Sequence, residues 1–250
     1  SYGKRYATFH CDDFDSEILG LKCAKIDYLA IIPYGEQTKR DLIDNLFNLF
    51  AKNKIEYVTI RINVSDLATI QTLEDSDFNI VDGYLTLQRN LDNIERTLIN
   101  PNIKIRQAAK KDILNLQNSI APGFIHSRFF NDPIIPKEKA VEIFREWIKN
   151  SVLGKVADCV FVAEAQGKAV GFITLEIDQR VGHIPLIGVE QAFRGKGVSH
   201  DLTSKAFDYF NKKKLKTVRI ETQITNIPAT RSYENIGFRL VDSSVTLRWA

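Results

Sequence analysis

Apolar residues recur every three or four positions in two distant segments, 42–53 and 202–213, as in helices that bury one face. A run rich in β-branched residues follows each segment and predicts a strand. A short helix and a second extended stretch complete each series. The predicted elements are helices at 42–53 and 202–213, strands at 55–62 and 215–222, helices at 66–75 and 227–236, and strands at 78–87 and 238–247.

The two series are copies of one another. Residues 42–87 align with 202–247 at a constant offset of 160, without a gap, and 13 of the 46 pairs are identical. Phe50 with Phe210 is one such pair. Because each copy alternates helices with strands, part of each sheet is predicted to be parallel.

The rest of the chain supplies further elements. Residues 91–102 are polar, contain Asn100-Pro101 and predict a linker. We expect helices at 110–119 and 136–150, and strands at 159–165, 169–177 and 183–189, with a hairpin turn at 166–168. The fold class is therefore α/β (α+β), a mixed twisted sheet with helices on both faces, in domains at 1–95 and 100–250.

Composition excludes several classes. Hydrophobic residues make up 44% and charged residues 26%, as in an ordinary globular protein rather than a disordered, collagen-like or disulfide-rich one. A net charge of +3 does not indicate nucleic-acid binding. The sequence has neither a membrane-spanning stretch nor a secretory apolar core near its start, and its three scattered cysteines fit free thiols. We expect a cytoplasmic location.

A small-residue loop joins the strand ending at Val189 to the next predicted helix. Such residues let consecutive N–H groups approach a ligand, and a helix start adds about half a positive charge, so the loop suits a pyrophosphate. It lacks the lysine of a GKS/T loop and the third glycine of a dinucleotide fingerprint. The alternative is a basic surface turn. The loop residues are Arg194, Gly195, Lys196, Gly197, Val198 and Ser199.

This loop, the strand after it and the segment PATRSYENIGF resemble, in that order, the GCN5-related N-acetyltransferase (GNAT) superfamily. Its CoA motif, Arg/Gln-x-x-Gly-x-Gly/Ala, is matched by Arg194, Gly197 and Ser199, with Ser replacing Gly or Ala. Its second signature is matched by Asn226, Tyr233 and Gly237-Phe238. The resemblance implies acetyl-CoA as cosubstrate and no metal.

The first copy lacks this chemistry. At the offset of 160, Arg194 falls on Tyr34, and Tyr233 falls on Leu73. We therefore expect a degenerate acetyltransferase-like half domain that packs and helps shape the substrate pocket, while the second copy alone binds CoA.

Roughly residues 10–250 are similar to one subgroup, the dTDP-fucosamine acetyltransferases of surface-polysaccharide synthesis. The similarity lies in 76–83 (SDFNIVDG), 126–129 (HSRF) with 147–150 (WIKN), and 219–238. It implies acetylation of the 4-amino group of a dTDP-linked 4-amino-4,6-dideoxy sugar.

The resemblance also assigns roles to residues. Backbone N–H groups at Ile187, Gly188 and Val189 would stabilise the oxyanion. Tyr233 would protonate the CoA thiolate, because tyrosine remains protonated at pH 7. Asn226 would hold the pantetheine, cap the following helix, or do both.

The remaining roles leave alternatives open. Asp82 matches the general base, where the subgroup more often has Glu, but Asp-Gly is also a common turn pair. His183 competes for that role or is a strand-end surface residue. Ser127 and Arg128 would meet the nucleotide diphosphate, since arginine pairs phosphates bidentately, although an exposed helix-end arginine fits equally.

Other functions also remain open. One is acetylation of a different amine, such as an aminoglycoside, a polyamine or a protein N-terminus. The other is a non-catalytic acyl-CoA-binding module. The expected partner is a nucleotide sugar, with no nucleic acid and no membrane span, and the oligomeric state is left open, a homodimer included.

Overall fold

The computed structural model describes residues 7–29, 36–92 and 100–250, with side chains from residue 41 onward in the second range. The chain forms two compact units. The N-terminal unit contains residues 1–84 and 243–250, and the C-terminal unit contains residues 85–242.

The N-terminal unit is a small mixed sheet with strand order β1-β2-β3-β11. β2 is antiparallel to β1 and parallel to β3, and β3 is antiparallel to β11. Its core gathers Phe50, Val58, Leu73 and Leu247. Its elements are β1 (Ala7–Cys11), α1 (Asp13–Leu19), β2 (Cys23–Leu29), α2 (Glu36–Lys52), β3 (Tyr57–Asn63), α3 (Leu67–Glu74) and the end of β11 (Arg239–Trp249).

The C-terminal unit is a larger mixed sheet with strand order β4-β10-β8-β7-β6-β5, in which β9 pairs with β7. β8 and β10 run parallel, whereas β5, β6 and β7 are joined by antiparallel pairings. The strands are β4 (Asn79–Asn90), β5 (Lys104–Gln107), β6 (Cys159–Ala165), β7 (Lys168–Asp178), β8 (Val181–Ile184), β9 (Ile187–Val189) and β10 (Thr217–Gln223). The α-helices are α4 (Ile113–Ser119), α5 (Arg128–Asn131), α6 (Lys137–Val152), α7 (Val198–Lys212) and α8 (Ile227–Asn235), and the 3₁₀ turns are η1 (Lys110–Asp112), η2 (Ala121–Gly123) and η3 (Gln191–Phe193).

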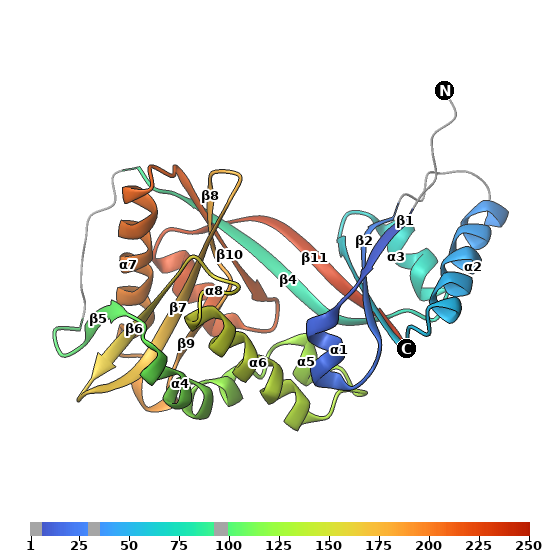
Figure 1. Ribbon diagram of the computed structural model, residues 1–250. Coiled ribbons are helices and arrows are strands. Elements are labelled where there is room, and N and C mark those ends of the chain that lie inside the picture. The colour runs from blue at the N-terminus through green and yellow to red at the C-terminus, as the bar shows by residue number, and fades with distance from the viewer. Residues whose placement is uncertain (1–6, 30–35, 93–99) are drawn as a thin grey trace. The chain divides into compact units, whose positions relative to one another are not determined.

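Helices cover both faces of this sheet (Figure 1). Ile173 on β7 belongs to the same core as Leu202 of α7. The next side chain back along the strand, Phe172, points to the other face and meets the ring of Phe124, which follows η2. The predicted mixed sheet with helices on both faces is therefore confirmed.

The last strand of each copy contributes to the other copy's unit. β4, teal in Figure 1, begins in the N-terminal unit, but its Leu85 and Leu87 lie in the core of the C-terminal unit. β11, red-orange, belongs from residue 243 onward to the N-terminal unit, where Leu247 is buried. This exchange divides the units within β4 and β11, rather than within the segment 91–102, of which 93–99 lie outside the described residues.

Two local predictions fare differently. The hairpin turn is confirmed, because Gln166 and Gly167 both have positive φ, as a two-residue type I′ turn requires. The single strand predicted at 183–189 is wrong. It is interrupted at Pro185, which has no N–H to donate, and resumes as β9 with a different set of neighbours.

Candidate active site

The site begins where the chain, after β8, stops pairing with β10. β8 pairs with β10 as far as Ile184 and Ile220, and β10 then continues to Gln223. Within the described chain, β9 pairs with β7 and with no other strand. The edge of β9 on the β10 side therefore has backbone groups available to an extended ligand.

Two glycines set the backbone conformation of the loop after β9. Gly195 has φ +73° and Gly197 has φ +78°, conformations that favour glycine. Gly197 is the N-cap of α7, and no side chain caps that helix start. Val198 is buried in the core and anchors the helix, while Ser199 is half-buried and its carbonyl accepts from Thr203 Oγ1. The free amides and the positive end of α7 suit an anion.

Both basic residues of the loop are exposed. Arg194 folds back so that its Nε donates to the carbonyl of Val189 at 3.1 Å. Lys196 lies 5.4 Å from the ring centre of Phe193, and its carbonyl accepts from Asn100 Nδ2 at 3.0 Å. Among the described residues, neither basic side chain forms an ion pair, so no carboxylate competes there with a phosphate.

Two residues of the second signature, Asn226 and Tyr233, lie at the N-cap of α8 and within that helix. Asn226 is its N-cap, with the side-chain oxygen accepting from the N–H of Ala229 at 3.4 Å. The helix-capping alternative for Asn226 is thus correct, and its contact with pantetheine stays a prediction. In the first copy, Asp66 caps α3 in the same way.

Tyr233 lies inside the core of the C-terminal unit, 6% exposed. Val198 belongs to the same cluster, and Ile187 and Val189 pack against it. Burial raises the pKa of the Tyr233 hydroxyl well above its usual range. This shift keeps the hydroxyl protonated at neutral pH and makes it a weaker acid than an ordinary tyrosine.

The segment with Ser127 and Arg128 lies beside the same helix. His126 Nδ1 is 3.4 Å from the hydroxyl of Thr225, the residue before the α8 cap. Ser127 is 5% exposed, and its Oγ has no hydrogen-bond partner among the described residues. The guanidinium of Arg128 lies 3.9 Å from the centre of the Phe129 ring. The sequence match at 126–129 (HSRF) includes His126, but sequence reasoning missed its contact with Thr225.

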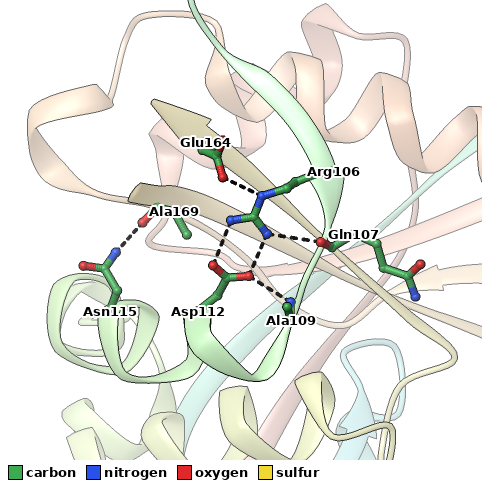
Figure 2. A network of polar contacts seen from close by, with 7 residues as sticks. All are labelled: Arg106, Gln107, Ala109, Asp112, Asn115, Glu164 and Ala169. Carbon is green, nitrogen blue, oxygen red and sulfur yellow. Dashed lines mark hydrogen bonds and ion pairs between the residues drawn. The ribbon is translucent and has the colours of Figure 1, made fainter. Parts of the chain in front are cut away.

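A polar network holds η1 and α4 to strands β5, β6 and β7 of the sheet (Figure 2). Arg106 on β5 donates to both carboxylate oxygens of Asp112, at 2.7 and 2.8 Å, and to Glu164 on β6 at 2.6 Å. The hydrogen bonds to Arg106 hold the pKa of the Asp112 carboxyl below its usual range. Asn115 of α4 donates to the carbonyl of Ala169. The network fixes the start of the chain segment that ends at the contact with β9.

That contact requires a glycine at position 188. A Cβ there would lie 2.5 Å from Ile120 Cγ2 and 3.0 Å from Phe172 Cε1. The segment around η2 therefore covers β9 closely. This close packing ties the backbone of Ile187–Val189 to the segment that leads to Ser127.

Asp82 lies in the N-terminal unit, 6% exposed, with Oδ1 accepting from the N–H of Gly83 at 2.9 Å. Its role as a base stays a prediction. His183 on β8 is opposite Glu176 and Arg219. Burial, with the nearby charge of Arg219, lowers the pKa of its imidazole.

The first copy differs at the positions predicted to bind CoA and to protonate it. Tyr34 lies outside the described residues. Leu73, at the position of Tyr233, is fully buried in the core of the N-terminal unit. That position therefore packs in both copies and offers a hydroxyl in the second copy only.

Two features are absent from the described residues. None of their helices is both long and apolar enough to cross a membrane. They also contain no group of three or more His, Cys, Asp or Glu side chains arranged to hold a metal ion.

Comparison with known proteins defines the class. The family model "Acetyltransferase (GNAT) family" matches residues 121–238, which include the loop, Asn226 and Tyr233. The chain carries a GNAT domain, and the protein is an N-acetyltransferase. The GNAT resemblance inferred from the sequence is confirmed.

Two relatives match most of this chain at low sequence identity. Spore coat polysaccharide biosynthesis protein SpsD of Bacillus subtilis is 25% identical over 227 residues, covering 90% of this chain and 76% of SpsD. The dTDP-fucosamine acetyltransferase of Escherichia coli O6:H1 is 24% identical over 182 residues, covering 72% of this chain and 75% of that enzyme.

A solved structure shares the architecture. A tandem GNAT protein from the clavulanic acid biosynthesis pathway superimposes with a TM-score of 0.62 at 13% identity, covering 92% of this chain and 75% of that one. At this identity the likeness shows the fold alone.

Proposed function

We propose that this N-acetyltransferase transfers the acetyl group of acetyl-CoA to the amino group of a dTDP-linked amino-dideoxy sugar of the dTDP-fucosamine type, for surface-polysaccharide synthesis. One observation carries the acetyl-transfer part. The uncapped start of α7, with Gly195 and Gly197 in left-handed conformations, follows directly on the free edge of β9. The pyrophosphate of CoA meets the loop amides, and the pantetheine runs along β9.

The reaction needs three groups. The neutral amine attacks the thioester carbon, forming the C–N bond, and the carbonyl oxygen becomes an oxyanion held by N–H groups of β9. The C–S bond then breaks, and the thiolate takes the proton of Tyr233. The nitrogen loses its extra proton to a base, for which Asp82 is our first candidate and His183 the second. Solvent returns a proton to Tyr233.

The sugar-nucleotide part rests on the segment before α5. The contact between His126 and Thr225 holds Ser127 and Arg128 beside the cap of α8. The buried Ser127 hydroxyl and the Arg128 guanidinium are suited to the oxygens of a diphosphate. SpsD and the dTDP-fucosamine acetyltransferase also bear names connected with polysaccharide and nucleotide-sugar chemistry.

Cofactor binding is tested by Gly197→Asp, measured by calorimetry with acetyl-CoA. The change places a carboxylate where phosphate is expected, so binding should be lost. The matched control is Gly167→Asp, which also has positive φ but lies at the β6–β7 turn with open space around it. Unchanged affinity in Gly197→Asp would refute the loop assignment.

The acceptor is tested with a panel of amines at fixed acetyl-CoA. The panel contains a dTDP-4-amino-4,6-dideoxy sugar, an aminoglycoside, spermidine and a peptide N-terminus. The proposal expects the highest kcat/KM for the nucleotide sugar, lowered in Arg128→Met through KM. A higher value for another amine would assign the enzyme to that class, and tight CoA binding without any turnover would indicate a binding module.

A further inference from the structure

Arg89 connects the first copy to the catalytic unit. It lies near the end of β4, the strand that the first copy contributes to the C-terminal unit. Its Nη1 donates to the carbonyl of Ile236, the C-cap residue of α8. Its guanidinium also lies 4.8 Å from the ring centre of Phe207 on α7. One side chain of β4, two residues beyond the end of the first copy, thus contacts both helices that carry the proposed site.

The end of α8 needs such a donor. The last carbonyls of a helix have no partner within the helix and carry partial negative charge. Arg239 supplies a second guanidinium, whose Nη1 donates to the carbonyls of Glu234 at 3.2 Å and Phe238 at 2.8 Å. Burial and the charge of Arg239 lower the pKa of Arg89, but arginine keeps its charge in proteins. Two cations therefore hold this helix end.

Arg89 lies close to the backbone of Gly237 on one side and beside a cavity on the other. Gly237 has φ +88°, and a Cβ there would lie 3.2 Å from Cζ of Arg89. Arg89 also lines a cavity of about 260 Å³ between residues of α7 and the end of α8. The other lining residues are His200, Ser204, Phe207, Asn235, Ile236 and Gly237. The apolar packing of α7 on the end of α8, in which the rings of Phe207 and Phe238 lie 5.8 Å apart, does not extend through this space.

We propose that Arg89 is a positioning residue that fixes the C-terminal end of α8 against α7 and thereby aims Tyr233. The inference rests on the proposed role of Tyr233. α7 begins at the CoA loop, and Tyr233 lies three residues before the Ile236 carbonyl that Arg89 holds. A shift of this helix end would move the phenol relative to a thiol bound along β9, and such misplacement slows proton transfer. The first copy thus supplies a part of the site through its exchanged strand.

Direct evidence comes from hydrogen–deuterium exchange in Arg89→Ala. Losing a hydrogen bond from a charged donor should speed exchange in residues 227–237 by roughly 10- to 100-fold. Exchange in β6 and β7 should stay as in the parent protein. The matched control is Arg180→Ala, an exposed arginine at the turn after β7. Unchanged exchange in 227–237, or equal acceleration throughout the unit, would overturn the inference.

Kinetics test the link to Tyr233. Arg89→Ala should lower kcat roughly tenfold or more, with a smaller change in the Kd for acetyl-CoA. Arg89→Lys should recover part of the loss, as should added guanidinium with Arg89→Ala. Combined with Tyr233→Phe, Arg89→Ala should cost little further, because both changes affect the same proton transfer. If the double variant instead lowers kcat by the product of the two single-variant factors, the positioning role is overturned.

The two hypotheses fail separately. If Tyr233→Phe alone keeps normal turnover, the tyrosine is not the proton donor and the proposed mechanism fails. The exchange of 227–237 still decides whether Arg89 holds α8, because that measurement does not depend on the reaction.

Discussion

Gly188→Ala is the substitution whose cost can be worked most directly from the structure. The added methyl would lie 2.5 Å from Ile120 Cγ2, 3.0 Å from Phe172 Cε1 and 3.2 Å from Phe124 Cζ. Ile120 is 1% exposed and Phe172 is fully buried, so neither can turn into solvent. Either β9 or the segment around η2 must therefore move.

Overpacking of this kind typically costs about 1–3 kcal/mol. For a unit of this size, that lowers Tm by roughly 2–12 °C. Because the displaced elements are β9 and the segment leading to Ser127, the KM values for acetyl-CoA and for the acceptor should both rise. Urea unfolding and steady-state kinetics on the same preparation measure the two effects.

Gly123→Ala is the matched control. Its new methyl would meet the end of the Arg194 side chain, with Nη2 at 2.7 Å, and that exposed side chain can turn away by giving up its exposed hydrogen bond to the Val189 carbonyl. Its free energy of unfolding should stay within about 0.5 kcal/mol of the parent value. A Gly188→Ala protein as stable as Gly123→Ala would refute the close packing of β9 against η2.

Three further predictions follow from groups described above. Arg106→Met should lower the free energy of unfolding by roughly 1.5–3 kcal/mol, because it leaves Asp112, 5% exposed, without its bidentate donor. Urea unfolding measures this change. The control Lys139→Met removes an exposed ion pair with Glu142 on α6 and should lower the free energy of unfolding by less than about 0.5 kcal/mol. Asp82→Asn should lower kcat/KM for the amine, spare acetyl-CoA affinity and shift the acidic limb of the pH profile; an unchanged profile would exclude Asp82 as the base. Because burial raises the pKa of Tyr233 above the usual value of about 10, its neutral form stabilises the fold fully below pH ~10, and that stabilisation is lost as pH rises further. Urea unfolding should therefore show an alkaline loss of stability that is smaller in Tyr233→Phe, and equal losses would contradict the burial argument.

The sequence predicted the elements that follow from local patterns. Helical spacing located α7, and β-branched runs located β6, β7 and β10 close to their observed bounds. The hairpin at Gln166-Gly167 followed from turn chemistry. The break at Pro185 was readable in principle, because proline cannot donate to a neighbouring strand.

The missed features depend on contacts between distant segments. Arg89 falls on Trp249 at the repeat offset, so the alignment gave no reason to select it. Its role depends on the end of β4 joining the C-terminal unit. Local periodicity predicts a strand but not which strands or helices it will contact. The contact of His126 with Thr225 joins residues 99 positions apart, for the same reason beyond the reach of a pattern.

The crossed final strands make the order of synthesis matter. The core of the N-terminal unit includes Leu247, and Trp249 packs on Phe47 with ring centres 5.3 Å apart. On a ribosome, residues 7–84 therefore emerge long before the strand that completes their sheet. Until then β3 presents an unpaired edge, the kind of surface that recruits other chains. Cutting the gene between the copies would leave each product without its partner's strand, so the duplication, once the strands had crossed, could no longer be undone by losing one half.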